Sequence, residues 1–146
     1  MTRLIKFARL EGPKRRVLIK TVFLVGLVRL GLWLLPFTTL CAVLGAFERR
    51  QARRDGAPRE TVERLIWASK MASRIVPAAN CLTQALAAKL ILRRNGYQPT
   101  LRLGATKNET GKFCAHAWLE HEGKIVIGHL RDLSRYASFP PVNFDR

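Results

Sequence analysis

The sequence has few cysteines and few acidic residues. The first shortage bears on the cellular compartment of the protein, and the second on the charge of its partners. Its three cysteines, Cys41, Cys81 and Cys114, are an odd number at irregular spacing. This argues against a disulfide framework and for a reducing compartment. The first long apolar run begins only around Thr21, too late for a secretory signal. A cytoplasmic location is therefore expected, with membrane association left open.

Acidic residues are outnumbered by basic ones. Ten Asp and Glu stand against 26 Lys and Arg, a formal net charge of +16. Residues 1–54 hold 12 basic and 2 acidic residues (+10), and the remainder holds 14 and 8 (+6). This charge predicts an acidic partner surface. Because the basic clusters flank an apolar run rather than exposed aromatic residues, membrane or protein contact is favoured and no nucleic-acid partner is expected.

The length of 146 residues, with 48% hydrophobic residues, predicts a single folded unit. Residues 1–56 are expected to form a basic, hydrophobic helical region, and residues 57–146 the core. The apolar run at 21–47 is long enough to span a membrane, but Arg29, Pro36 and basic flanks on both sides oppose a span. Two helices broken near Pro36 and packed on the protein or a partner are favoured over interfacial or spanning insertion.

Two further helices are predicted, followed by a sheet. The first runs from Pro58 to about Ile75. The second opens after the N-cap residue Asn80, reads CLTQALAAKLILRR and stops at 95–96, with its basic residues Lys89, Arg93 and Arg94 in solvent. Apolar residues then alternate, which predicts antiparallel strands TLRL (100–103), FCAHAWLE (113–120) and KIVI (124–127). The fold class is therefore α+β.

Cys81 and His116 are the candidate catalytic pair. Free N–H groups and the dipole at a helix N-terminus stabilise a thiolate, which is the reactive form of cysteine. His116 lies 35 residues downstream on the middle strand, where Cys114, Trp118 and Glu120 share its face. It could take the thiol proton and later give it to a departing amine. Spacing alone also fits a structural cysteine and a core histidine.

A metal site is not expected. Cys114 could be grouped with Cys81 and with His121 or His129, but the chain has no close CxxC or HxxxH ligand pair. Structural zinc sites normally take their ligands in such pairs.

The segments CLTQALAAKLILRRNGYQPTLRLGA and FCAHAWLEHEGKIVIG resemble the leader peptidases of lasso-peptide gene clusters. The resemblance covers about residues 60–142. Its specific pieces are the helix-opening Cys-Leu, the Leu-Arg-Arg-x-Gly helix end and the Ala-His-Ala-Trp-Leu-Glu strand. It implies a papain-like, transglutaminase-like cysteine peptidase core with N-terminal helices. Cys81 would cut between the leader and the core of a ribosomally made precursor peptide, and no cofactor is implied.

The resemblance also implies partners and a third catalytic residue. The chain is similar to the split form of the family, in which a separate leader-recognition protein presents the precursor and an ATP-dependent macrolactam cyclase closes the ring. Members with a full triad carry an Asp about a dozen residues after the His-Ala-Trp motif, where this chain reads Ile127-Gly128-His129. Asp132 is the nearest acid and the candidate third member, unless the backbone or water orients His116.

Two rival functions remain open at this point. One is a non-catalytic basic scaffold that recruits an acidic partner to the membrane, with Cys81 and His116 as structural residues. The other is acyl transfer, in which the same nucleophile passes the acyl group to an amine instead of water.

Overall fold

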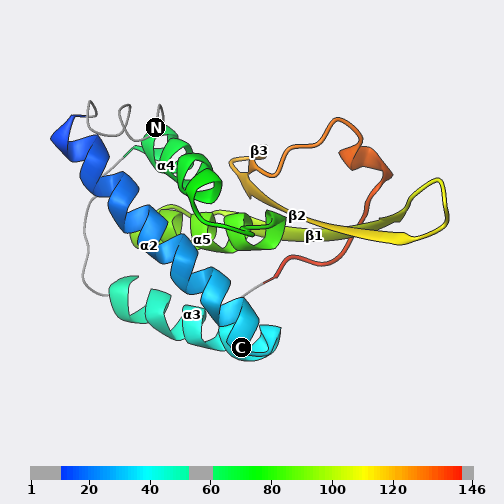
Figure 1. Ribbon diagram of the computed structural model, residues 1–146, viewed down its shortest axis with the longest axis horizontal. Coiled ribbons are helices and arrows are strands. Elements are labelled where there is room, and N and C mark those ends of the chain that lie inside the picture. The colour runs from blue at the N-terminus through cyan, green and yellow to red at the C-terminus, as the bar shows by residue number, and fades with distance from the viewer. Residues whose placement is uncertain (1–10, 53–60, 143–146) are drawn as a thin grey trace.

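The computed structural model describes residues 11–52 and 61–142, where helices precede an antiparallel sheet (Figure 1). The helices are α2 (Gly12–Leu34), α3 (Phe37–Ala52), α4 (Val62–Ile75) and α5 (Cys81–Arg94). The strands are β1 (Thr100–Lys107), β2 (Phe113–His121), β3 (Lys124–Ile127) and β4 (Ala137–Ser138), with a short 3-10 helix η1 (Leu133–Arg135) before β4. The sheet order is β3-β2-β1-β4. The predicted α+β class is confirmed.

The long apolar run forms parts of two helices, and the break between them lies where the sequence predicted. Leu35 is extended, as a residue before proline prefers, so α2 ends at Leu34 and α3 restarts at Phe37. The first helix begins at Gly12, earlier than the apolar run itself. Only one face of α2 is buried, and it packs against α4 and α5. The predicted boundary at 56/57 lies outside the described residues.

The helix α4 is shorter than predicted at its N-terminus. Thr61 is its N-cap, and the Thr61 hydroxyl accepts a hydrogen bond of 3.4 Å from the Arg64 N–H. The helix therefore begins at Val62, whereas Pro58, the predicted start, lies outside the described residues. Its end at Ile75 is as predicted.

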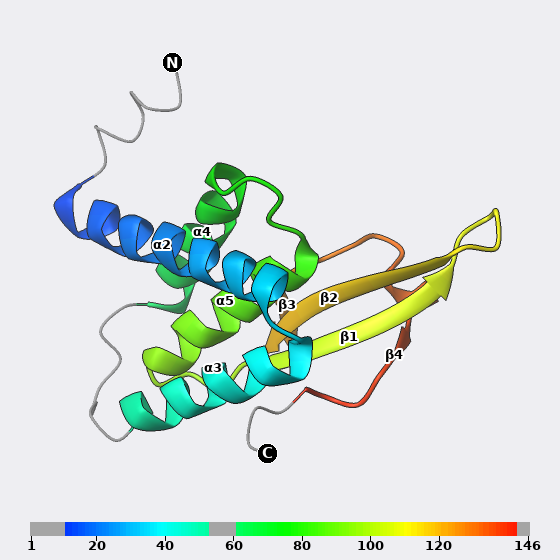
Figure 2. The ribbon, with the colours of Figure 1, turned by 60° about the horizontal axis from the view of Figure 1, so that its bottom comes forward.

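The helix α5 is the centre of the molecule (Figures 1 and 2). It contacts α2, α3 and α4 on one side and β1, β2 and β3 on the other. Three small residues, Ala85, Ala87 and Ala88, are fully or almost fully buried, which lets neighbouring elements approach its axis closely. Leu86 and Leu90 fill the core with Leu119 and other residues of the sheet.

The expectation that Lys89 is solvated is wrong. Lys89 is 5% exposed, and its ammonium group donates a hydrogen bond of 2.9 Å to the carbonyl of Val142. A buried ammonium needs such an acceptor, so this contact ties the end of the described chain to α5. Arg93 also has a protein partner, because it pairs with the buried carboxylate of Glu48 on α3 at 3.1 Å.

The sheet is built on a long β1–β2 hairpin. Its register runs from Thr100 opposite Glu120 to Lys107 opposite Phe113, so β1 is longer than the predicted TLRL strand. On the other side of β2, β3 pairs only with residues 119–121. The chain then leads from the β3 edge to the opposite edge, where β4 pairs with β1 at Gly104 and Ala105 (Figure 2). The strand β4 was not predicted.

Candidate functional site

Cys81 is the first residue of α5, and Asn80 fixes that start. The side-chain oxygen of Asn80 accepts hydrogen bonds of 2.9 Å from both the N–H and the hydroxyl of Thr83, which is fully buried. This is the N-cap predicted from the sequence. Within the described residues, the N–H groups of Cys81 and Leu82 form no hydrogen bond. They are therefore free to stabilise negative charge at the end of the helix.

The turn before Cys81 carries backbone strain. Ala78 has a φ of 57°, in the left-handed region that a residue with a Cβ atom adopts at a cost of about 1 kcal/mol. The turn is closed by the N–H of Ala79, which donates to the carbonyl of Val76 at 3.4 Å. Such strain is retained where the surrounding structure fixes the backbone. Here it lies three residues before the candidate nucleophile.

His116 is held by a backbone carbonyl. Its Nε2 lies 2.7 Å from the carbonyl oxygen of Gly128. A carbonyl only accepts hydrogen bonds, so Nε2 must carry the proton in this contact. In the neutral ring this leaves the lone pair on Nδ1, which is then the basic nitrogen. The contact therefore sets both the orientation of the imidazole and its tautomer.

Gly128 is suited to this role by its lack of a side chain. It has a φ of +80°, and a Cβ atom there would lie 2.6 Å from the carbonyl oxygen of Ala117 and 3.0 Å from the Cα of Trp118. Only glycine lets the chain turn away from β3 this close to β2. Gly128 belongs to the stretch where a full triad would place its Asp, so a backbone oxygen occupies the region expected to hold a carboxylate.

Two aromatic rings flank His116. The Trp118 ring is stacked beside it, with centroids 6.3 Å apart, and the Tyr136 ring lies 5.9 Å away at a tilted angle. Trp118 is itself fixed, because its Nε1–H donates to Glu120 at 3.0 Å and Glu120 pairs with Arg102 at 3.4 Å.

Space for the Trp118 ring comes from a glycine on the neighbouring strand. A Cβ atom at Gly104, directly opposite His116 in the hairpin register, would lie 2.9 Å from that ring. The missing side chain at Gly104 therefore leaves room for the Trp118 ring beside β1.

The structure does not join Cys81 to His116 by a hydrogen bond within the described residues. Ala117 and Leu119 belong to the core with α5, whereas His116 extends from the other face of β2, as the alternation predicts. The pairing of these two residues stays a prediction.

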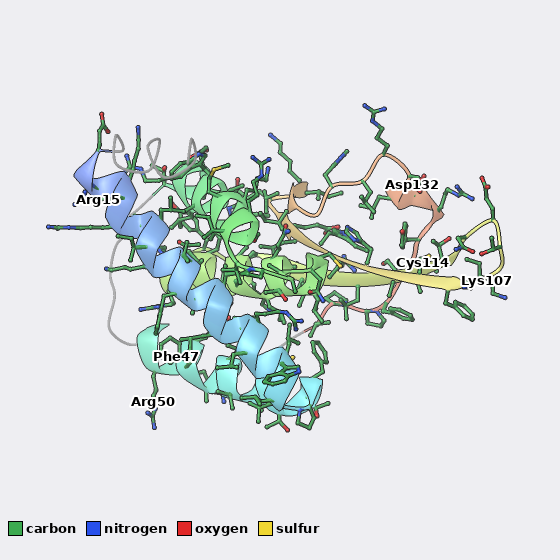
Figure 3. The ribbon with its side chains drawn as sticks, viewed as in Figure 1. Arg15, Phe47, Arg50, Lys107, Cys114 and Asp132 are labelled. Carbon is green, nitrogen blue, oxygen red and sulfur yellow. The ribbon has the colours of Figure 1, made fainter. Side chains whose placement is uncertain are left out.

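Asp132, the third candidate, is exposed at the start of η1, on the loop between β3 and β4 (Figure 3). In the part of the chain that the structure describes, its carboxylate has no hydrogen bond or ion pair. Its catalytic role also stays a prediction.

The other two cysteines differ in environment. Cys114 lies near the hairpin tip on β2 (Figure 3) and contacts the carbonyl of Lys112 at 3.9 Å. Burial raises the pKa of the Cys41 thiol, and the nearby charge of Lys89 partly opposes that shift. Across residues 11–52 and 61–142, no three His, Cys, Asp or Glu side chains are grouped closely enough to hold a metal ion.

The edge of β2 beside His116 is not paired with another strand of the described chain. Because β3 pairs only with residues 119–121, no described strand covers residues 113–116 on that side. An uncovered edge offers backbone N–H and C=O groups to a peptide. The candidate base therefore lies next to a surface that can hold an extended chain.

Sequence reasoning missed two members of this site. Tyr136 stands in a segment without periodicity, and only the folded loop brings it to His116. Gly128 was noted as the place of a missing carboxylate, yet nothing in a glycine indicates that its carbonyl points at a histidine. The signal that could have found it is a glycine directly after a strand that neighbours the His-Ala-Trp strand.

The chain was compared with known protein families once its fold and candidate site had been described. The transglutaminase-like superfamily matches residues 25–141, which is most of the chain and runs from the middle of α2 through β4. This superfamily includes cysteine peptidases. Comparisons with curated proteins and with solved structures gave no significant match. By the extent of the family match, the chain belongs to the transglutaminase-like superfamily.

Proposed function

We propose that this chain is a cysteine peptidase that removes the leader from a ribosomally synthesised lasso-peptide precursor. The observation that carries the proposal is the carbonyl of Gly128, which holds His116 with Nδ1 free as a base. A cysteine at the first position of a capped, buried helix supplies the nucleophile. The family match is consistent with this chemistry.

In the first step, Nδ1 of His116 takes the thiol proton and Cys81 Sγ attacks the carbonyl carbon of the leader–core peptide bond. The N–H of Cys81 would stabilise the negative oxygen that forms. The C–N bond then breaks, and His116 gives its proton to the amine of the first core residue. A thioester joins Cys81 to the leader.

In the second step, water replaces the released amine. His116 takes a proton from this water, whose oxygen attacks the thioester carbon, and the thiol leaves. The products are a leader with a free carboxylate and a core with a free N-terminal amine. A separate ATP-dependent macrolactam cyclase would consume that amine to close the ring.

The substrate is proposed to bind as an extended segment along the open edge at residues 113–116. Backbone pairing there would hold the peptide beside His116 without reading its sequence. Recognition of the leader would then fall to a separate leader-recognition protein, which delivers the precursor to this chain.

The test is mass spectrometry of a precursor incubated with this protein and the leader-recognition protein. Wild type should release the intact core, whereas Cys81→Ala and His116→Ala should each reduce cleavage by at least about 10³-fold. Cys114→Ala is the matched control, because it removes a half-buried thiol two residues from His116 and should cut like wild type. Cleavage that survives Cys81→Ala would refute the proposal.

Acyl transfer is a second candidate, favoured by the same thioester and by the superfamily match. The two reactions differ in what attacks the thioester. With precursor and an added primary amine, a peptidase yields the leader carboxylate. This carboxylate carries one ¹⁸O when the water is labelled. An acyl transferase yields the leader amide with no label. If neither product forms, the result favours a non-catalytic scaffold.

A further inference from the structure

The helix α2 has two opposite faces, and the outer one is unusually apolar. Leu18, Thr21, Val25 and Val28 face the protein and are almost fully buried. On the other side, six large apolar side chains are exposed: Ile19 (51%), Phe23 (68%), Leu27 (47%), Leu30 (48%), Trp33 (75%) and Leu34 (63%). At 100° per residue these six fall on one side of the helix. Contiguous apolar surface of this kind indicates an interaction site.

Basic residues extend the same face toward the N-terminus of α2. Arg15, Arg16 and Lys20 are exposed and precede the apolar stripe, with Arg15 pointing outward at the end of the helix (Figure 3). The last turns of α3 add more positive charge through the exposed Arg49 and Arg50.

Negative charge in this region is already neutralised. Residues 11–52 hold two carboxylates, Glu11 and Glu48. Glu11 pairs with Lys14 at 3.4 Å, and Glu48 is buried against Arg93. No exposed carboxylate without a cationic partner is therefore present in this part of the described chain to repel an anionic surface.

We propose that the outer face of α2 binds the surface of an anionic lipid bilayer, with the helix lying in the membrane plane. The apolar stripe would enter the boundary between headgroups and acyl chains, with the aromatic ring of Trp33 at that depth. The basic residues would contact the lipid phosphates, where each contributes about a fivefold gain in affinity.

In-plane binding is favoured over a membrane span because of what α2 contacts. By length and composition α2 could cross a membrane. Its inner face, however, packs on α4 and α5 along the helix and belongs to the hydrophobic core. A span would have to pull that face out of the core, whereas binding in the plane leaves every core contact in place.

The experiment is vesicle co-sedimentation of the full chain with phosphatidylcholine alone and with phosphatidylcholine containing phosphatidylglycerol. Wild type should bind only the anionic vesicles, and salt should weaken that binding. The charge variant Arg15→Gln/Arg16→Gln/Lys20→Gln should bind about 100-fold more weakly. A control that removes three exposed charges elsewhere, Lys112→Gln/Lys124→Gln/Arg131→Gln, should bind like wild type.

A second pair of variants tests how much the apolar side chains contribute to vesicle binding. Phe23→Ser/Trp33→Ser should lose binding, whereas Phe113→Ser, which removes an equally exposed ring (77%) at the hairpin, should keep it. Because these side chains are exposed, circular dichroism should show all variants folded.

Two outcomes would overturn the proposal. One is no binding to anionic vesicles, which leaves a protein partner as the occupant of this face. The other is binding that neutral vesicles support equally and that alkaline carbonate does not reverse, which indicates a span. The proposal does not depend on the peptidase chemistry, because Cys81→Ala should bind vesicles like wild type.

Discussion

The helices α2 and α5 show opposite relations between composition and burial. By sequence α2 is the more apolar, with leucine, valine, phenylalanine and tryptophan over most of its length, yet its outer face is exposed. By contrast, α5 carries lysine, threonine and glutamine but is buried on nearly every side. Small residues and paired polar groups make a helix central, because they allow close approach on all faces. The exposed apolar side chains of α2 are not part of the core. They therefore indicate a separate function for the outer face of this helix.

The largest expected difference between the two helices is in stability. Leu86→Ala in α5 should lower the free energy of unfolding by about 3 kcal/mol, because it leaves a cavity in the core. Phe23→Ala in α2 should change it by less than about 0.5 kcal/mol, because that ring is exposed. Urea unfolding without lipid measures both. Equal losses would mean that the outer face of α2 is covered in solution.

Two glycines distinguish backbone strain in a turn from the positioning of His116. Gly123 and Gly128 both have positive φ, but a Cβ atom at Gly123 meets nothing within 4 Å. Gly123→Ala should cost about 1 kcal/mol, and Gly128→Ala about 2 kcal/mol more because of the clash with β2. Only Gly128→Ala should also reduce cleavage of the precursor, since it displaces the carbonyl that orients His116. Full activity in folded Gly128→Ala would remove that carbonyl from the mechanism.

The two helix caps test whether the start of α5 matters beyond stability. Asn80→Ala and Thr61→Ala each remove an N-cap and should each lower the free energy of unfolding by about 1 kcal/mol. Only the Asn80 variant should also slow cleavage, because Cys81 follows directly. Thermal melts and initial cleavage rates make the comparison. If both variants cut at equal rates, the cap has only a structural role.

Local sequence signals predicted most of this fold. Asn80, the Asn95-Gly96 stop and Pro36 each act on their own neighbours, so the ends of α5 and the break between α2 and α3 could be placed in advance. The alternation in 113–120 likewise placed His116 opposite the core face of β2.

What escaped prediction depends on residues distant in sequence. Lys89 is buried because the carbonyl of Val142 meets it, 53 residues later. The position of Tyr136 depends on the course of a loop without a repeating pattern, and β4 is only two residues long. The burial of Lys89 has no local pattern that could predict it, and the glycine that follows β3 does not by itself indicate a contact with His116.

Alkylation shows whether Cys81 is a nucleophile that His116 activates. The folded protein is treated with limiting iodoacetamide near neutral pH, and the three cysteines are followed by peptide mapping. Cys81 should react first and Cys41 last, because burial raises the pKa of the Cys41 thiol. His116→Ala should slow Cys81 and leave Cys114 unchanged. If Cys81 reacts no faster than Cys114, or reacts at the same rate without His116, then Cys81 is not a thiol that His116 activates.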